Sequence, residues 1–564
     1  MENKKTERGE KNMKKLLFGL LGLTLILGLI ACGNNNNNDD ETTDNTDAGV
    51  IDTSGLPEPR FTPDPNIPSW QQDYDHYVEL TWYINYGWFA AVPWGTDVPT
   101  RQMQTDLGIT INFIVGDTDN LNTMIAGGDL PDIITMGGYL DITREAYRFA
   151  HPLNVLAELY DPYFLEHAAK PDSLAWHTLP NGNIYGYPNF STTAEDVELG
   201  RVQGNQAFMV RRDIYEAIGS PDMSTPDGFL DALRAAVAHT PEADHGVPLI
   251  AFAGNAMDMA SGDDGSFGES LQDFLGIPVI DENGEFYDRD ANPEYLAWLQ
   301  VFRQALSEGL MTNDQFSDDG SIMNERQTLG TYFAFLESNL NGLVHVLHNN
   351  NDRAPEQEYI PVRGPSNSNG ADPDFAAGGI GGWVQTFVTT QAEDPQTAMQ
   401  VITYLVSEHG QVVNAFGIEG ETFNWVDGMA EFTEEVAALS SEDLDYMGIR
   451  KYWLLQDSAF TNSIGGLPPV SLAPHIEWST QYLVPRFHME DIDPIGDSSI
   501  GRSLATIDTN RTQAIVAVMQ APDDATAEQI WNDFLASREN NDWAEILAYR
   551  NERIADNMDR LGLR

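Results

Sequence analysis

The sequence HYVELTWYI, residues 76–84, begins the region that decides the fold, because β-branched and aromatic residues of this kind form buried strands. A helix-like stretch that ends at a glycine (98–109) and a second strand-like stretch (109–116) follow it. NLNTMIAGG (120–128) is typical of a short helix that glycines terminate, and DLPDIITM (129–136) enters another buried strand. This β-α-β-α-β order predicts an α/β fold with a largely parallel sheet and helices on its faces.

The loop after the first predicted strand is a candidate binding site. Sheets of this type bind ligands beyond the carboxyl ends of their strands, and the loop NYGWFAAVPWG (85–95) places aromatic residues there beside polar residues and glycines. We single out Asn85, Tyr86 and Trp88 as ligand-binding residues, although part of the aromatic content of this loop would simply cover the sheet edge. Tyr139 follows the strand DIITM, so we expect it at the next carboxyl edge.

The first residues predict export and lipid anchoring. Five lysines precede an apolar run (16–30) that is too short to span a bilayer comfortably as a helix. The sequence LIAC (29–32) fits the Leu-x-small-Cys signal of bacterial lipoproteins, in which lipid is attached to the cysteine and cleavage occurs just before it. We interpret residues 1–31 as a lipoprotein signal peptide and Cys32 as the lipid anchor. A secreted protein or an uncleaved signal anchor is the alternative.

The segment after Cys32 is rich in Asn, Asp, Thr and Gly. A segment of this composition buries too little apolar surface to offset the entropy of ordering the chain. We therefore expect residues 32–71 to form a disordered tether between the lipid anchor and the folded part of the chain.

The composition excludes several classes of function. A formal net charge of −57 repels the phosphates of nucleic acids, so we expect no nucleic-acid partner. With 1 cysteine and 11 scattered histidines in the chain, no disulfide framework can form and no zinc site is expected. The stretch DENGEFYDRD (281–290) lacks the ligand spacing of a calcium loop and is interpreted as a hairpin. We expect neither a metal nor a cofactor.

Several segments occur in an order that one protein family shares. They are LNTMIAGGDLPDIITM (121–136), NGNIYGYPN (181–189), VRRDIYEAIG (210–219) followed by STPDGFLDAL (224–233), and FGIEGETFNWVDG (416–428). These segments follow a lipoprotein signal in the sequence. Together and in this order, they resemble the extracellular solute-binding proteins of ABC importers, in particular the Gram-positive lipoprotein branch associated with oligosaccharides. The pair at 210–233 lacks the tryptophan and the glutamate that are usual in that family.

The resemblance implies a two-lobed type II periplasmic-binding-protein fold with a hinge between the lobes. It assigns 72–190 and 375–435 to a first α/β lobe, and 191–374 and 436–564 to a second lobe that includes the C-terminal helices. The crossing segments are expected near 181–189 and 364–382.

The resemblance also extends the candidate ligand-binding residues. Sugars present flat apolar faces edged by hydroxyls, so their sites combine aromatic rings with planar polar groups. For each tryptophan the alternative is a place in the core, and for the loop residues it is loop packing. The added candidates are Trp383, Glu419, Trp425, Trp453 and Trp478.

The sequence thus predicts a lipid-anchored receptor on the extracellular face of the cell membrane. As a monomer without a catalytic step, it would capture an oligosaccharide and deliver it to the membrane subunits of an ABC importer. A receptor for a peptide or another small solute is the alternative within the same fold. A surface glycoside hydrolase is the alternative enzyme, because carboxylates such as Asp263 and Asp264 are abundant. The chain has no nucleophile elbow, His-Glu-x-x-His motif or phosphate-binding glycine loop.

Overall fold

The computed structural model describes residues 55–563, except 74–75, 255–266, 319, 339, 440 and 466–471. The predicted signal peptide, Cys32 and the first part of the predicted tether lie outside the described residues. Asp263 and Asp264 also lie outside them.

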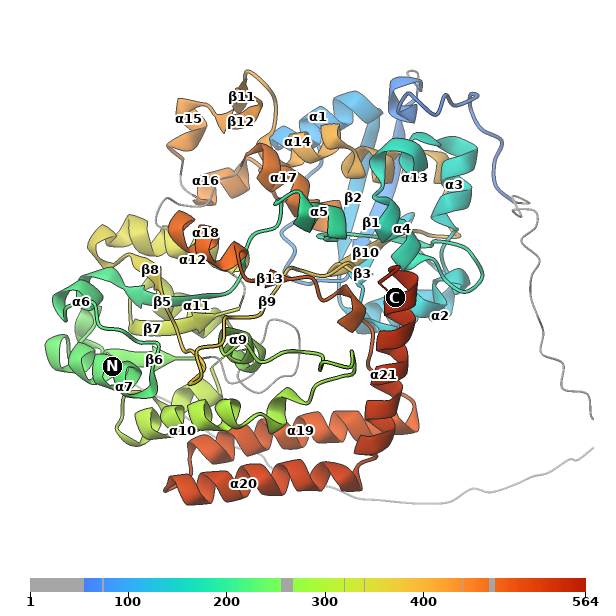
Figure 1. The fold of residues 1–564 in the computed structure, drawn as a ribbon. Helices are drawn as coiled ribbons and strands as arrows, with labels where there is room; N and C mark the ends of the chain where they lie inside the picture. Colours follow the sequence, from blue (N-terminus) through green and yellow to red (C-terminus); the bar gives the residue numbers. More distant parts are fainter. Residues whose placement is uncertain are drawn as a thin grey trace, which may run out of the picture. The chain divides into compact units, whose positions relative to one another are not determined.

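The first lobe is built on a five-stranded sheet with the order β2-β1-β3-β10-β4 (Figure 1). The strands are β1 (Val78–Ile84), β2 (Ile109–Val115), β3 (Ile133–Gly137), β4 (Gly186–Pro188) and β10 (Val384–Val388). β1 pairs in parallel with β2 and β3, whereas β10 is antiparallel to β3 and β4. The predicted β-α-β-α-β order is confirmed.

The helices that complete this order begin and end where the sequence provides caps. α1 (Val98–Leu107) begins at Asp97, whose carboxylate accepts a hydrogen bond from the Thr100 backbone N–H, and it ends at Gly108. Gly108 has φ 65°, and a Cβ there would lie 2.5 Å from the carbonyl oxygen of His76, so only glycine fits. The other helices of this lobe are α2 (Thr118–Gly127), α3 (Leu153–Tyr160), α4 (Pro171–His177), α13 (Pro395–Val406), α14 (Glu408–Phe416) and α17 (Ser458–Ile464).

The second lobe contains a four-stranded sheet with the order β6-β7-β5-β8. The strands are β5 (Ala207–Arg211), β6 (Ile250–Ala253), β7 (Tyr332–Glu337) and β8 (Tyr359–Val362). β6 is parallel to β7, and β5 is antiparallel to both of its neighbours, so β6, β7 and β8 end at the same edge.

Helices from both halves of the chain cover the second sheet. Figure 1 shows α10, α19 and α20 side by side, and their apolar faces share one core with β5 and β6. The helices of this lobe are α6 (Arg212–Ala217), α7 (Pro226–His239), α9 (Phe267–Phe274), α10 (Pro293–Ser307), α11 (Gly320–Thr328), α12 (Leu340–Arg353), α18 (Ala473–Thr480), α19 (Ser499–Met519), α20 (Asp524–Ser537) and α21 (Trp543–Arg560).

The chain passes between the two sheets from β4 to β5, through the short helix α5 (Ala194–Glu198), and again from β8 to β10. In the second passage β9 (Phe375–Ala376) pairs in parallel with β13 (Leu483–Val484). The hairpin of β11 (Phe423–Val426) and β12 (Met429–Phe432), with α15 (Glu434–Ala437) and α16 (Ser441–Tyr446), follows α14.

Two segments pack in other parts of the structure than the lobe boundaries expected from the sequence would place them. Tyr452, Leu454 and Leu455 belong to the core around β1, so the chain after 436 stays with the first lobe for longer than expected. The last part of the expected tether is folded, because Arg60 forms ion pairs with Asp73 and Asp394 at 2.7 and 2.6 Å. Arg60 and Asp394 are far apart in the sequence, so no local sequence pattern predicts their contact.

Candidate functional site

Four aromatic side chains meet beyond the first sheet: Tyr86, Trp88, Trp383 and Trp453, which we call the aromatic cluster. The ring centroids of Trp383 and Trp453 are 4.8 Å apart, and those of Tyr86 and Trp383 are 5.0 Å apart. The rings of Trp88 and Trp383 are nearly parallel, with an interplanar angle of 4° and centroids 6.1 Å apart. All four were predicted as ligand-binding residues, and the structure brings them together.

The topology of the sheet explains this convergence. β1 ends at Ile84, so Tyr86 and Trp88 lie beyond its carboxyl end. Trp383 precedes β10, and because β10 runs antiparallel to β3, the start of β10 lies at the carboxyl edge of β3. There the backbone N–H of Gly138 donates a hydrogen bond to the Trp383 carbonyl at 2.9 Å.

Asn189 holds two parts of the aromatic cluster in place. Its side-chain oxygen accepts a hydrogen bond from the Val384 N–H at 2.9 Å, and its amide donates to the Trp453 carbonyl at 3.2 Å. Asn189 is fully buried at the end of the NGNIYGYPN segment. Asn189 was not predicted as a site residue, although it lies within a segment that carried the family resemblance.

The aromatic cluster offers open ring faces and a phenol hydroxyl beside them. Trp88 is 62% exposed and Trp383 is 39% exposed, although such large apolar side chains are usually covered. The buried Tyr86 hydroxyl lies beside the hydroxyl of Tyr139, which is exposed to solvent. Burial raises the pKa of Tyr86, and the neighbouring Tyr139 hydroxyl raises it further, so the phenol stays protonated and able to donate.

Tyr139 and Asn85, the other two residues predicted at the carboxyl edge of the first sheet, differ in their exposure to solvent. Tyr139 is 70% exposed and close enough to influence the Tyr86 hydroxyl. Asn85 is buried, and its amide donates to the Thr118 hydroxyl at 3.1 Å, which ties the end of β1 to the start of α2. The structure therefore gives Asn85 a positioning role within the fold.

Glu419 and Trp425 lie on the β11–β12 hairpin and the turn before it. Trp425 is 41% exposed, and its ring contacts Phe423, which packs against α14. Glu419 is exposed. No ring contact or hydrogen bond of the described residues joins either side chain to the aromatic cluster.

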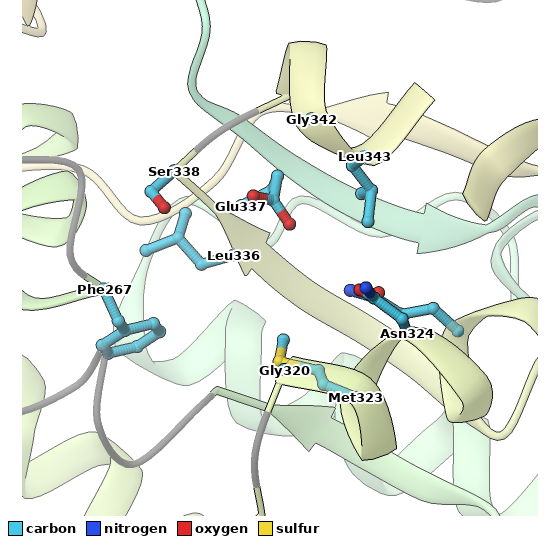
Figure 2. A pocket seen from close by; sticks show the side chains of 10 residues that line it. Phe267, Gly320, Met323, Asn324, Leu336, Glu337, Ser338, Gly342 and Leu343 are labelled. Carbon is cyan, nitrogen blue, oxygen red and sulfur yellow. The ribbon is translucent and has the colours of Figure 1, made fainter. Parts of the chain in front are cut away.

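The carboxyl edge of the second sheet contains a cavity of about 220 Å³ where β7 ends. Figure 2 shows that its lining comes from the end of β7, from α11, and from the first turns of α9 and α12. Polar side chains, Asn324, Glu337 and Ser338 among them, alternate with apolar ones such as Met323 and Leu343. This cavity was not predicted, because the strand that ends in Glu337 was not recognised from the sequence.

Trp478 lies on α18 in the second lobe, apart from the aromatic cluster. It is half-buried, and its ring packs against the Phe375 ring with centroids 5.7 Å apart. The guanidinium carbon of Arg363 lies 3.6 Å from the centroid of its ring.

Among the described residues, no group of three or more His, Cys, Asp and Glu side chains is arranged to hold a metal ion. The stretch 281–290 forms a tight turn in which the Asp281 carboxylate accepts hydrogen bonds from the backbone N–H groups of Asn283 and Glu285. Isolated antiparallel pairing of Ile280 with Phe286 flanks this turn, as a hairpin requires.

No protein-family model and no curated protein matches the sequence. Solved structures do match the fold. A substrate-binding protein of an ABC transporter from Streptococcus pneumoniae, in complex with kestose, matches with a TM-score of 0.65 and 15% identity over 85% of this chain and 99% of the other. An alginate-binding protein matches with a TM-score of 0.61 and 16% identity over 85% and 98% of the two chains.

A third similar structure is the N-glycan transport solute-binding protein of Streptococcus pneumoniae. Its TM-score is 0.57, with 12% identity over 86% of this chain and 99% of the other. These matches cover nearly the whole length of each solved chain. They confirm the predicted two-lobed solute-binding-protein fold.

Proposed function

We propose that the protein is a receptor that binds an oligosaccharide between its two lobes and delivers it to an ABC importer. The observation that carries the proposal is the aromatic cluster, whose open ring faces lie where a fold of this type binds its ligand. Sugar rings stack on such faces by their C–H surfaces, and their hydroxyls bind polar groups at the rim. The neighbouring Tyr86 and Tyr139 hydroxyls supply such groups.

The solved structures with the same fold support this choice of ligand. One is in complex with kestose, one is an alginate-binding protein and one is an N-glycan transport protein, and all three of these ligands are carbohydrates. At 12–16% identity the likeness itself concerns the fold alone, so the ligand class of this chain rests on its own aromatic cluster.

We propose binding without catalysis. A glycosidase needs two carboxyl groups about 5–9.5 Å apart on either side of the scissile bond. The aromatic cluster consists of indole and phenol rings, which stack but do not exchange protons with a glycosidic oxygen at neutral pH. Ligand binding would instead stabilise the closed arrangement of the lobes, to the extent that the ligand binds that arrangement more tightly.

We further propose that lipid on Cys32 holds the receptor on the extracellular face of the membrane. None of the helices that the structure describes is both long and apolar enough to cross a bilayer. Cys32→Ser removes the only thiol of the chain, so it should release the protein into the medium or leave the signal uncleaved. Normal processing with unchanged membrane retention would contradict the anchor.

Solution scattering with a sugar product assay tests the receptor function. The chain without its signal should be screened for a rise in melting temperature against a panel of oligosaccharides. With a sugar that raises it, the radius of gyration should fall, and the sugar should be recovered intact. An unchanged radius together with a cleaved linkage would replace the receptor by a hydrolase. If a peptide raises the melting temperature and no sugar does, the ligand is a peptide and not an oligosaccharide.

A further inference from the structure

Arg363 lies at the same edge of the second sheet as the end of β7. It follows β8 directly, and β7 and β8 run in the same direction because both are antiparallel to β5. Val362 is opposite Phe208 and Glu337 is opposite Ala207, so the two strands end within one residue of each other. Arg363 is therefore placed at the carboxyl edge, where a fold of this kind receives its ligand.

The Arg363 guanidinium is supported on a fixed aromatic surface. Its central carbon lies 3.6 Å from the centroid of the Trp478 ring. That ring is held by Phe375 at 5.7 Å and by Tyr482 at 5.4 Å between centroids, both in edge-on contacts. A guanidinium over an aromatic face keeps its N–H groups pointing outward in its own plane. Arg363 is also exposed, so those N–H groups are accessible.

Arg363 has no carboxylate partner among the described residues, in a chain with 87 acidic and only 30 basic residues. Another arginine of the same lobe shows the contrast. Arg486 pairs with Asp273 at 2.8 Å and with Asp374 at 3.1 Å. Partial loss of water around the side chain lowers the pKa of Arg363, and the neighbouring Tyr482 offsets only part of this effect.

The other titratable groups beside Arg363 leave its charge uncompensated. Burial lowers the pKa of His475, and its Nε2 lies 2.7 Å from the Gln206 carbonyl, so the imidazole is neutral and donates there. Tyr482 packs edge-on against the same Trp478 ring and carries no carboxylate. Glu477 is exposed and adjacent to Trp478 along α18, so the helix turns it about 100° away from the Trp478 side chain.

We propose that Arg363 is a specificity-determining residue that binds the carboxylate of an acidic oligosaccharide, such as a uronic-acid oligomer. This inference rests on the proposed function and adds the class of sugar. A free guanidinium edge binds a carboxylate through two parallel N–H···O bonds, which are roughly twice as strong as bonds to neutral hydroxyls. The overall negative charge of the chain does not decide this contact, because salt screens charges beyond about 8 Å under physiological conditions.

Matched pairs of sugars test the proposal. The probes are tetramers of galacturonate, mannuronate and glucuronate, each with its carboxyl-reduced neutral counterpart, and binding is measured by calorimetry. For at least one pair, the wild-type chain should bind the acidic member at least 10-fold more tightly. Arg363→Gln should reduce that preference to below about twofold, while its affinity for the neutral member stays within twofold of wild type.

Two further variants separate binding from folding. Arg212→Gln removes a half-buried arginine at the start of α6, directly after β5, that pairs with Glu358 at 2.5 Å, and it should leave the preference unchanged. Arg363→Lys keeps the charge and loses the two-pronged geometry, so it should retain part of the preference. This variant also gives the answer if Arg363→Gln does not fold.

The outcomes distinguish this inference from the proposed function. Equal binding of both members by the wild-type chain, or an acid preference that survives in Arg363→Gln, would overturn the role of Arg363 and leave the sugar receptor intact. If neither the acidic nor the neutral tetramers nor the wider oligosaccharide panel binds, the proposed function fails and this inference fails with it.

Discussion

The two sheet edges that would face a ligand differ in kind. The first-lobe edge presents the aromatic cluster, in which rings already stack on one another and leave large faces open. The second-lobe edge presents a cavity of about 220 Å³ with mixed lining, together with the Arg363 guanidinium over Trp478. Stacking on rings tolerates many sugars, whereas a charged edge and a polar cavity discriminate among them. We therefore expect the first lobe to supply most of the affinity and the second lobe most of the selectivity.

The largest expected difference between the lobes concerns their buried carboxylates. In the first lobe, Asp161 is fully buried and accepts a hydrogen bond from the Ser69 hydroxyl at 2.6 Å, and burial raises its pKa to about 6. In the second lobe, burial opposes ionisation of Asp290, but the Arg511 guanidinium 2.7 Å away outweighs it and lowers the pKa.

These opposite shifts predict opposite pH dependences. Protonated Asp161 stabilises the first lobe fully below pH 3.8, and this contribution, up to about 3 kcal/mol, is lost as the pH rises through 6. The contribution of Asp290 is present above pH 3.8 and is lost as the pH falls through its lowered pKa. Hydrogen exchange resolved by lobe, corrected for intrinsic rates, should show both trends, and Asp161→Asn should flatten the first. If the stability of both lobes depends on pH in the same way, the assignment of the two trends to Asp161 and Asp290 is wrong.

The next largest effect concerns sugar binding. Trp383→Ala should weaken binding by about 1–3 kcal/mol, the range for removing an aromatic anchor from an interface. Trp425→Ala is a matched control, because Trp425 is 41% exposed and Trp383 is 39% exposed, yet Trp425 lies on the β11–β12 hairpin. Calorimetry should show unchanged affinity for the control. Equal losses in both variants would mean that the aromatic cluster has no special role.

A smaller effect is expected from Gly382, which sets the position of Trp383. Gly382 has φ 72°, and a Cβ there would lie 2.2 Å from the Asn189 carbonyl oxygen. Gly382→Ala should therefore cost about 1–2 kcal/mol of stability and weaken sugar binding less than Trp383→Ala does. Gly428→Ala is the control. Gly428 has φ 84°, and nothing lies within 4 Å of a Cβ there, so this variant introduces backbone strain without a close contact. Melting curves that coincide for the two variants would show that the contact with Asn189 is unimportant.

The smallest effect is expected from salt. Binding of a neutral oligosaccharide depends on uncharged rings in the first lobe, so its dissociation constant should change less than twofold between 50 and 500 mM NaCl. The preference for an acidic member of a matched pair should shrink over the same range, because it depends on the Arg363 charge. A strong salt dependence for neutral sugars would place the main contacts on charged groups.

The sequence was most informative about the first lobe. Strand composition and glycine stops along 76–136 are local signals, and the carboxyl-edge rule then placed Tyr86, Trp88 and Tyr139 without knowledge of tertiary contacts. Trp383 and Trp453 came from the family resemblance, and their contact with Tyr86 depends on the antiparallel course of β10.

The sequence was least informative where partners lie far apart along the chain. The ion pair of Arg60 with Asp394 orders residues that composition alone assigns to a tether. Arg363 resembles any loop arginine until Trp478 is found against it, 115 residues further on. Glu419 and Trp425 have the composition of a sugar site but lie on a hairpin that packs against α14.

The most direct test of the account is a crystal structure of the chain with an oligosaccharide that raises its melting temperature. We expect a sugar ring within van der Waals contact, about 4 Å, of an exposed face of the aromatic cluster, with one of its hydroxyls hydrogen-bonded to the Tyr86 phenol. A sugar bound at the β11–β12 hairpin, or confined to the second-lobe cavity with the aromatic cluster untouched, would contradict it.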